Sequence, residues 1–554
     1  MPMWLLFLLV FAAGVLVGAA PLSPIASASA RGFLAEPDVV DPVASADHST
    51  ITGVNGLADG LSPADVTIYL ADADGSPVVG VVPVFEATGY ENSYGLCSAT
   101  NDEGISTCTL LSTVGEMKTL HLTSPVEVEG NEVTFVQGCN PAGDPFGGGR
   151  GTEAHPHTLC GADQLNRING QGLARHFQLF ADIDMANTDF QIIGSQNQFS
   201  GVFDGQGYSI SNLVIDNAQA TPAGFFGYLS GEVFDLSLID IDILARHSVG
   251  GLAGLAFDAR IEDVVVQGVV EATEDLVGGL VGSISAGTVE RAYLDVEVIG
   301  QDIVGGLVGE LHSVGQINAS TVAGTVAGEN TVGGLAGLVR QESSIEDSSS
   351  TATVSATGSG AGGFVGTLQG NSILQETSAT GDVSGEVDVG GLVGRVLQSY
   401  VYSSLATGGV SSTRTTGNSN TGGLIGFVTT GHVEDSYAAG SVDGHFNAGG
   451  LIGTLGTINA NDTDQAIVNR TYAVGLVTGA NTPGGLVGIV FSNVTITSSY
   501  WNTETTNQGS SAGGTGRTTE EMGEESNFVG WVFSPAADHV WVMPVGGPPM
   551  LWFE

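Results

Sequence analysis

Three aspartates near the start of a repetitive region are the side chains whose type and spacing come closest to an active site. They are Asp182, Asp184 and Asp204. Two carboxyl groups held about 5–9 Å apart can share the acid and base or nucleophile roles of a glycoside hydrolase. Asp204, however, opens an Asp-Gly turn, and the other two belong to a short motif of alternating residues. We therefore favour structural roles for all three.

Other chemical signatures are weak. Arg260, Arg291, Arg340 and Arg395 occur singly, so we expect each to pair with a nearby carboxylate. None of the ten histidines is followed by Glu, which excludes the H-E-x-x-H zinc motif. One G-x-S-x-G string, at 509–513, lies in a Gly/Ser/Thr-rich stretch without the strand and helix of a nucleophile elbow. We expect a linker there, no catalytic residue, no resident cofactor and no enzyme activity.

The cysteines are four in number, which favours disulfides in an exported chain. Four cysteines allow three connectivities, and nearness in sequence suggests local pairs. A zinc site is the weaker alternative, because the spacing is not C-x2-C. Calcium on Asp72 and Asp74 is a further alternative to an ordinary Asx turn. The two expected pairs are Cys97 with Cys108, and Cys139 with Cys160.

The charge balance excludes several partners. The chain has 554 residues, with 13 basic and 59 acidic side chains, a net charge of −46 and one lysine, Lys118. It lacks the basic footprint of a nucleic-acid-binding protein and the polybasic patch that attracts anionic membranes. Acid-rich, lysine-poor surfaces suit salty water, where their self-repulsion is screened, so we expect a halophilic or marine source.

The first 30 residues have the composition of an export signal. The apolar run 4–17 is followed by the small residues Ala26 to Ala30, which provide an A-x-A cleavage site. An uncleaved membrane anchor is the alternative, because the stretch 3–22 is nearly long enough to span a bilayer. Either way, we expect an extracellular or cell-surface protein.

Residues 47–138 contain short alternating runs separated by turns, as in a β-sandwich. Their order resembles the bacterial Ig-like domains of the invasin/intimin type, which implies a spacer or presentation module. The residues that carry this resemblance are Asp59-Gly60, Ser62, Ala64, Val66-Thr67, Leu70, Asp72, Asp74-Gly75, Pro77-Val78, Gly80-Val81, Thr100, Gly104 and Gly115.

Residues 151–508 form a repeat array. A Gly-Gly-x-x-Gly signature, preceded by a degenerate copy at Ala223, recurs mostly every 27–29 residues, which is typical of a solenoid. A second signature, such as Ser436, Ala438, Gly440 and Val442, alternates with period two and predicts a strand with small inward side chains. We expect a parallel β-solenoid whose glycines occupy corners of positive φ. The signature starts at Gly250, Gly278, Gly305, Gly333, Gly362, Gly390, Gly422, Gly449 and Gly484.

Two repeats are longer than the others, and the positions of the flanking glycines place the insertions in 411–420 and 457–468. Insertions of this kind map to surface loops of a solenoid, often on its binding side. We expect these two loops to provide the most specific contacts.

The two signatures together are similar to the GLUG-motif repeats of bacterial surface proteins. The opening motif Phe203-Asp204-Gly205-Gln206-Gly207 and the closing motif Ser499-Tyr500-Trp501-Asn502 resemble theirs too. We expect residues 509–554 to cap the last coil, because a terminal coil otherwise exposes a strand edge. The resemblance implies a non-enzymatic, adhesin-like protein whose acidic solenoid binds glycans, proteins or copies of itself. A polysaccharide lyase or glycoside hydrolase of the β-helix type is the alternative.

Overall fold

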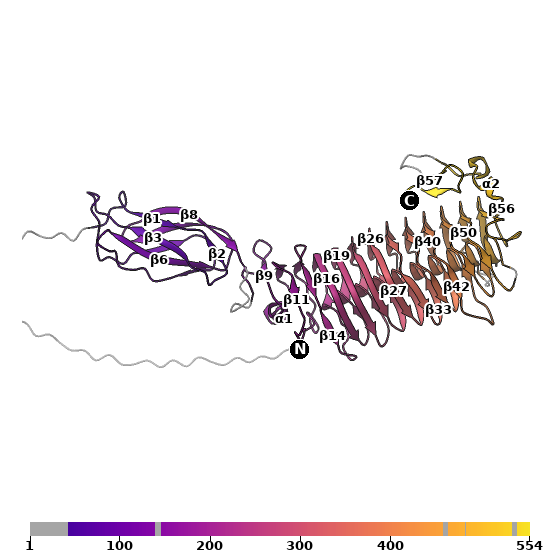
Figure 1. Ribbon diagram of the computed structural model, residues 1–554, viewed down its shortest axis with the longest axis horizontal. Coiled ribbons are helices and arrows are strands. Elements are labelled where there is room, and N and C mark those ends of the chain that lie inside the picture. The colour runs from indigo at the N-terminus through magenta and orange to yellow at the C-terminus, as the bar shows by residue number, and fades with distance from the viewer. Residues whose placement is uncertain (1–42, 139–145, 458–463, 482, 534–539) are drawn as a thin grey trace, which may run out of the picture.

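The computed structural model describes residues 43–138, 146–457, 464–481, 483–533 and 540–554. The predicted signal segment 1–30 and Cys139, the expected partner of Cys160, lie outside these residues. A β-sandwich precedes a rod of stacked coils, and the C-terminal segment lies beside the far end of the rod (Figure 1). The fold is therefore all-β with a parallel β-solenoid, as the sequence predicts. Among the described residues, no helix has the length and apolar character needed to cross a bilayer.

The sandwich consists of two four-stranded sheets in the orders β1-β3-β6-β5 and β2-β8-β7-β4. Inward residues alternate with outward ones along its strands, and Val66, Ile68 and Phe135 are buried between the sheets. The strands are β1 (Thr50–Gly53), β2 (Gly56–Ala58), β3 (Ala64–Tyr69), β4 (Val84–Ala87), β5 (Asn92–Tyr94), β6 (Ile105–Ser112), β7 (Met117–Ser124) and β8 (Val128–Gln137).

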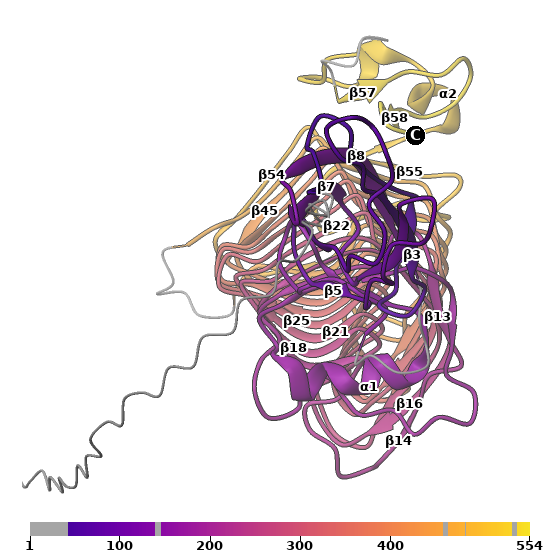
Figure 2. The ribbon, with the colours of Figure 1, turned by 90° about the vertical axis from the view of Figure 1, so that its left-hand side faces the viewer.

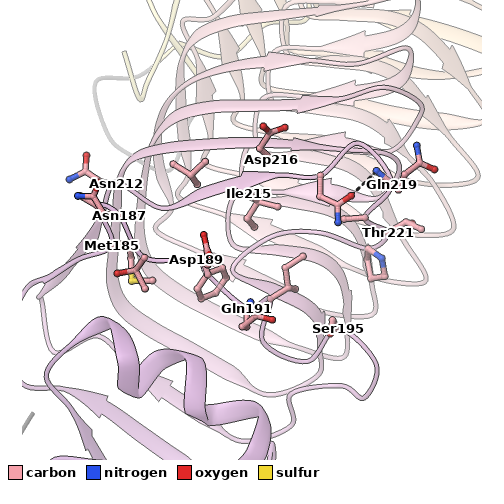
Figure 3. Close-up of a pocket in the computed structure, with 18 of the residues that line it drawn as sticks. Met185, Asn187, Asp189, Gln191, Ser195, Asn212, Ile215, Asp216, Gln219 and Thr221 are labelled. Carbon is pink, nitrogen blue, oxygen red and sulfur yellow. Dashed lines mark hydrogen bonds between the residues drawn. The ribbon is translucent and has the colours of Figure 1, made fainter. Parts of the chain in front are cut away.

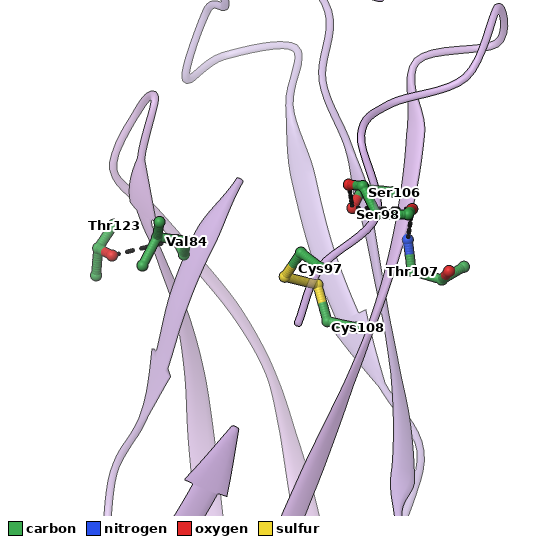
Figure 4. Close-up of a disulfide and its surroundings, with 7 residues drawn as sticks. All are labelled: Val84, Cys97, Ser98, Ser106, Thr107, Cys108 and Thr123. Atoms are coloured by element: carbon green, nitrogen blue, oxygen red, sulfur yellow. Dashed lines mark hydrogen bonds between the residues drawn. A yellow bond between two sulfur atoms is a disulfide. The ribbon is translucent and has the colours of Figure 1, made fainter. Parts of the chain in front are cut away.

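A disulfide joins Cys97 to Cys108 inside this sandwich, with 4.3 Å between the two Cα atoms (Figure 4). Cys108 lies on β6, and the segment that carries Cys97 runs beside this strand, where the N–H of Ser98 donates to the carbonyl of Thr107. The only lysine of the chain, Lys118, is also buried here and pairs with Glu116 at 2.6 Å. The covalent and ionic links both fix loops of the sandwich.

The solenoid coils supply strands to three parallel sheets, which we call the ten-stranded, the eight-stranded and the long sheet. The ten-stranded sheet contains β15 (Phe226–Leu229), β18 (Ala253–Phe257), β21 (Val281–Ser285), β25 (Val308–His312), β29 (Ala336–Val339), β34 (Val365–Gln369), β39 (Val393–Leu397), β44 (Ile425–Val428), β49 (Ile452–Leu455) and β53 (Val487–Val490). The eight-stranded sheet contains β17 (Val249–Gly250), β20 (Val277–Gly278), β24 (Asp302–Gly305), β28 (Asn330–Gly333), β33 (Ser359–Gly362), β38 (Val387–Gly390), β43 (Thr421–Gly422) and β48 (Ala448–Gly449).

The long sheet runs the length of the rod. Its strands are β9 (His157–Leu159), β10 (His176–Leu179), β11 (Ile183–Asp184), β12 (Val202–Asp204), β13 (Ser209–Ser211), β14 (Val214–Asp216), β16 (Glu232–Ala245), β19 (Arg260–Ala272), β22 (Thr288–Glu290), β23 (Tyr293–Ile299), β26 (Gln316–Asn318), β27 (Thr321–Gly328), β30 (Ser344–Glu346), β31 (Ser349–Ser350), β32 (Thr353–Ala356), β35 (Ile373–Gln375), β36 (Ser378–Ala379), β37 (Val383–Gly385), β40 (Ser399–Tyr402), β41 (Leu405–Ala406), β42 (Val410–Ser412), β45 (Gly431–Glu434), β46 (Tyr437–Ala438), β47 (Val442–Asp443), β50 (Ala466–Asn469), β51 (Tyr472–Ala473), β52 (Val477–Thr478), β54 (Val494–Thr497), β55 (Tyr500–Asn502) and β56 (Thr515–Arg517).

The interior of the rod is filled by aligned rows of small and aliphatic side chains. Ser436, Ala438, Gly440 and Val442 are all buried, so the small residues of period two face inward as predicted. The helix α1 (Ala162–Gln171) lies across the N-terminal end of the coils (Figure 2). Its Leu165 and Ile168 belong to the same hydrophobic core as the coils, so the helix covers the first coil.

The nine repeat glycines form one row along the rod, each paired with the corresponding glycine of the next coil. The expectation that they occupy corners of positive φ is wrong, because none of the nine has a positive φ. A Cβ atom on Gly422 would lie 2.0 Å from the carbonyl oxygen of Ile425 and 2.7 Å from the amide nitrogen of Gly453. Glycine recurs here because backbone segments approach too closely to admit any side chain.

One row of left-handed corners falls two residues before seven of the nine repeat glycines and mostly carries other residue types. Their φ values lie between 46° and 81°. Asn and Asp adopt this conformation most readily among the non-glycine residues, because their short side chains can bond locally. The corner residues are Ser248, Leu276, Ile303, Thr331, Gly360, Asp388 and Asn447.

The C-terminal segment covers the edge of the last coil and also packs against the side of the final coils. Its strand β56 pairs with β55, and the carbonyl of Ser510 accepts from the N–H of Gly485, so this part covers the exposed edge. The remainder, with α2 (Thr519–Met522), η1 (Glu525–Asn527), β57 (Trp541–Val542) and β58 (Met550–Leu551), packs against the side of the final coils (Figure 1). The apolar cluster at this contact comprises Leu405, Tyr437, Tyr472, Tyr500, Met522, Phe528, Trp531, Trp541 and Leu551.

Candidate binding surfaces

A groove with a volume of about 1240 Å³ lies near the N-terminal end of the solenoid. We call it the N-terminal groove. Figure 3 shows its two walls, one from residues 185–196 and the other from residues 212–222 of the next coil. The residues that line it are Met185, Ala186, Asn187, Thr188, Asp189, Phe190, Gln191, Ile192, Ser195, Gln196, Asn212, Val214, Ile215, Asp216, Asn217, Gln219, Ala220, Thr221 and Pro222.

The groove exists because one strand lacks a neighbour. β14 pairs with β16 of the following coil. The stretch 186–192, which occupies the preceding coil, forms no strand, so the other edge of β14 has no partner strand among the described residues. Such an edge presents unpaired backbone N–H and C=O groups. The groove therefore combines backbone donors and acceptors with the side chains of two polar loops.

Several polar side chains of the groove have no hydrogen-bonding partner in the described part of the chain. Asn187, Gln191 and Ser195 are exposed, and their side chains make no such bond. The ring of Phe190, which also lines the groove, stacks on that of Phe225, with centroids 5.4 Å apart and an interplanar angle of 9°. The groove thus offers free amide and hydroxyl groups together with apolar surface.

Of the three aspartates singled out by sequence, two bond to the next coil and the third bonds within its own turn. Asp182 accepts hydrogen bonds from the amide and hydroxyl of Ser209 in the next coil, at 2.8 and 3.0 Å, and these bonds lower the pKa of Asp182. The side-chain amide of Asn212 donates to Asp184 at 2.8 Å and lowers the pKa of that carboxyl. Asp204 accepts from the N–H of Gln206 within its own turn. A general acid needs a raised pKa, so the contacts of Asp182 and Asp184 favour structural roles.

The four single arginines all form ion pairs. Arg340, for example, contacts Glu310 at 2.5 Å, and Glu310 is nearly buried. Arg260, Arg291 and Arg340 each engage a carboxylate of a neighbouring coil and so reinforce the stacking, whereas the partner of Arg395 lies in its own coil. The pairs are Arg260 with Glu232 and Glu262, Arg291 with Glu262, Asp263 and Glu290, Arg340 with Glu310, and Arg395 with Asp388.

Two further motifs also have structural contacts. The hydroxyl of Ser511, in the G-x-S-x-G string, accepts from the N–H groups of Leu486 and Val487 at 3.1 and 2.9 Å and so covers the last coil. Asp72 accepts from the N–H groups of Asp74 and Ser76, as in an Asx turn. Within the described ranges, no group of His, Cys, Asp or Glu side chains is arranged to hold a metal ion.

The two insertions lie at different corners of the coil. The first follows β42 and precedes β43, so it joins the long sheet to the eight-stranded sheet. The second joins β49 to β50: Leu455 and Ala466 pair with Val428 and Gly431 of the preceding coil, which places the extra residues between them. Residues 458–463 of this loop lie outside the described residues. The two insertions therefore connect different pairs of sheets.

Sequence reasoning did not find the N-terminal groove. Its side chains belong to polar stretches such as Ala186–Gln191 in the first coils, where neither repeat signature is present. That departure from the repeat is the only sequence signal for it. The structural reason, an unpaired strand edge opposite a loop, depends on how successive coils align.

The comparisons with known proteins identify the repeat. The family model named "The GLUG motif" matches residues 328–355 and 417–443. The solenoid carries GLUG motifs. Each match runs from one coil into the next and ends within or just after a strand of the long sheet, β32 in the first case and β47 in the second. The GLUG motif therefore corresponds to the structural repeat.

Two curated relatives share part of this chain's sequence. Halomucin of Haloquadratum walsbyi is 27% identical over 252 residues, which are 41% of this chain and 2% of that protein. A protein of Evansella cellulosilytica described as a Gly-rich membrane protein is 33% identical over 122 residues, which are 20% of this chain and 14% of that protein. The chain thus spans only a small fraction of either relative.

Solved structures resemble the GLUG chain distantly. A protein of Bacteroides ovatus described as an immunoglobulin A1 protease is 19% identical, with a TM-score of 0.30, and the match covers 74% of this chain and 97% of that one. Invasin, described as a bacterial integrin-binding protein, is 25% identical, with a TM-score of 0.16, over 19% of this chain and 22% of that one.

Proposed function

We propose that this protein is an exported, non-enzymatic cell-surface protein whose acidic GLUG solenoid binds glycans, proteins or copies of itself through many weak contacts. The observation that carries the proposal is the repetition of the same strands in the same register along the rod. Each coil places equivalent outward side chains next to those of its neighbours. Linked weak sites gain apparent affinity because each later contact is intramolecular.

The contacts of the side chains best suited to catalysis support a binding role over the alternative of a polysaccharide lyase or glycoside hydrolase. Asp182 and Asp184 are engaged between coils, and their lowered pKa values suit acceptors of hydrogen bonds more than acids. Ser511 is engaged by the backbone of the last coil. Similarity to halomucin over 252 residues is compatible with a surface location. The proposal includes export by the N-terminal signal.

The test uses the full chain on glycan and protein arrays printed at high and low ligand density. We expect retention at high density and little retention at low density, because avidity requires several ligands within reach of one rod. Equal retention at both densities would contradict the multivalent mechanism, and retention by no ligand would contradict the binding function. Variants lacking 413–419 or 458–463, compared with the intact chain, test whether the inserted loops contribute.

Catalysis is tested separately. The intact chain is incubated with neutral and acidic polysaccharides, and the products are assayed for reducing and unsaturated ends. We expect neither to accumulate. Their release would favour the lyase or hydrolase alternative.

A further inference from the structure

We infer that the N-terminal groove binds a neutral saccharide. This inference rests on the proposed binding function and assigns one ligand class to one site. It is distinct from the weak, repeated contacts of the solenoid faces, because the groove occurs where the repeat is interrupted. Its walls come from two successive coils, so a ligand in it contacts both (Figure 3).

The charge of the groove selects against anionic ligands. Its lining contains no Lys, Arg or His, whereas Asp189 and Asp216 contribute carboxylates from opposite walls. The chain as a whole carries a net charge of −46. A uronic acid or a sulfated sugar would meet like charge on both walls without a compensating cation, and like charges repel at this range. A neutral ligand avoids this repulsion.

The polar groups of the groove match the hydroxyl groups of a sugar. Some amides on the rod bond between coils, as Asn447 does to Asn420 at 2.9 Å, and others, such as that of Gln375, are exposed. The groove differs because it brings the exposed side chains of Gln191 and Ser195, which have no partner among the described residues, into one hollow. Amides and hydroxyls both donate and accept, as sugar hydroxyls do.

The apolar surface and the size of the groove fit the remaining surface of a sugar. Val214, which is exposed, and Phe190, which is half-buried, provide apolar area for the C–H faces of a pyranose ring, and the stack on Phe225 fixes the Phe190 ring. The volume of about 1240 Å³ exceeds the range of roughly 300–1,000 Å³ that is common for small-molecule sites. An oligosaccharide of several units therefore suits the groove better than a single sugar.

The open edge of β14 also resembles the sites at which extended peptides add a strand. This edge is short, however, because β14 has only three residues, Val214–Asp216. The other hydrogen-bonding groups of the groove are side chains on irregular loops, which do not repeat with the spacing of a peptide backbone. The mixture of side-chain amides and a short edge therefore favours the saccharide.

The experiment measures binding of the full chain to maltohexaose, cellohexaose, mannohexaose and N-acetylchitohexaose by titration calorimetry. Hexagalacturonic acid serves as the anionic probe and the hexapeptide (Val-Thr)3 as the strand probe. The groove variant is Gln191→Ala with Ser195→Ala, which removes two exposed side chains that have no internal bond. The matched control is Gln375→Ala with Ser355→Ala, two exposed side chains of the long sheet.

We expect at least one neutral hexasaccharide to bind, hexagalacturonic acid not to bind, and the groove variant to lose about tenfold in affinity through two lost hydrogen bonds. The control variant should bind as the parent does. Binding that is equal in the parent and the groove variant would overturn the assignment to the groove while leaving the proposed function intact.

Binding of the peptide with no binding of any neutral saccharide would overturn the ligand class. If the arrays retain the chain only through charged glycans or proteins, the ligand class is likewise overturned and the proposed function stands. Failure to bind any array ligand would contradict the proposed function itself.

Discussion

Replacement of Gly422 by Ala should destabilise the coils around it more than an ordinary Gly-to-Ala change. The new Cβ would lie 2.0 Å from the carbonyl oxygen of Ile425 and 2.7 Å from the amide nitrogen of Gly453 in the next coil. An ordinary van der Waals contact begins near 3.4 Å. Both obstacles are backbone atoms, so no side chain can rotate away. The turn from Gly422 to Ile425 must distort to relieve the first contact, and the next coil must shift to relieve the second.

The expected cost follows from this geometry. Overpacking a tight core costs about 1–3 kcal/mol when side chains can adjust, so we expect about 3 kcal/mol or more at Gly422. Gly409→Ala, in the repeat that begins at Gly390, is the matched control. There the nearest atom to a new Cβ is a side-chain oxygen of Asp382 at 3.1 Å. We expect an effect within about 1 kcal/mol, with either sign, because alanine also restricts the unfolded chain.

Hydrogen exchange followed by mass spectrometry on the full chain distinguishes the two variants. Each coil of a solenoid contacts only its neighbours, so damage should remain local. Gly422→Ala should accelerate exchange in peptides covering 421–455 and leave those covering 249–285 unchanged, whereas Gly409→Ala should change neither. Equal exchange in the two variants would refute the argument that close backbone approach explains the repeat glycine.

Three further predictions concern the ends of the rod and the sandwich. Replacing Cys97 and Cys108 by Ser should lower the unfolding free energy of the sandwich by about 2–3 kcal/mol, because the disulfide closes a short loop. Guanidinium denaturation under oxidising conditions measures this change. An unchanged midpoint would contradict the prediction. Burial, together with the charge of Arg175, lowers the pKa of His157 from 6.5 to about 4. As the pH falls, the imidazole of His157 therefore gains its proton in the unfolded chain before it does in the folded chain, so the solenoid should lose stability between about pH 6.5 and 4. The variant His157→Gln should flatten that part of a plot of melting temperature against pH. Trp541 is 1% exposed and packs in the cluster that holds the C-terminal segment. Trp541→Ala should lower the stability of this segment by about 3–5 kcal/mol, which should appear as faster proteolysis of 519–554. Unchanged proteolysis would show that other contacts hold the segment.

The sequence determines the repeat, its period and much of its register. Glycine rows, such as the one through Gly250 and Gly278, pair in the structure because equal repeat lengths place equivalent residues of parallel coils side by side. The small inward residues are likewise determined locally, since a strand sends alternate side chains to opposite faces. The positions of the two insertions follow from the same counting.

The tertiary structure decides what each repeated residue does. The sequence pattern suggests that glycine provides positive φ at the turns. In the structure, two backbone atoms exclude a Cβ at Gly422: the carbonyl oxygen of Ile425 in the same coil, at 2.0 Å, and the amide nitrogen of Gly453 in the next coil, at 2.7 Å. The N-terminal groove arises because β14 faces a loop in place of a strand, and this depends on the alignment of two coils. The C-terminal segment covers Tyr437 and Tyr472, more than 60 residues upstream of Trp541. Sequence therefore fixes contacts that repeat at constant spacing, whereas contacts made where the repeat breaks require the folded chain, because only packing brings those segments together.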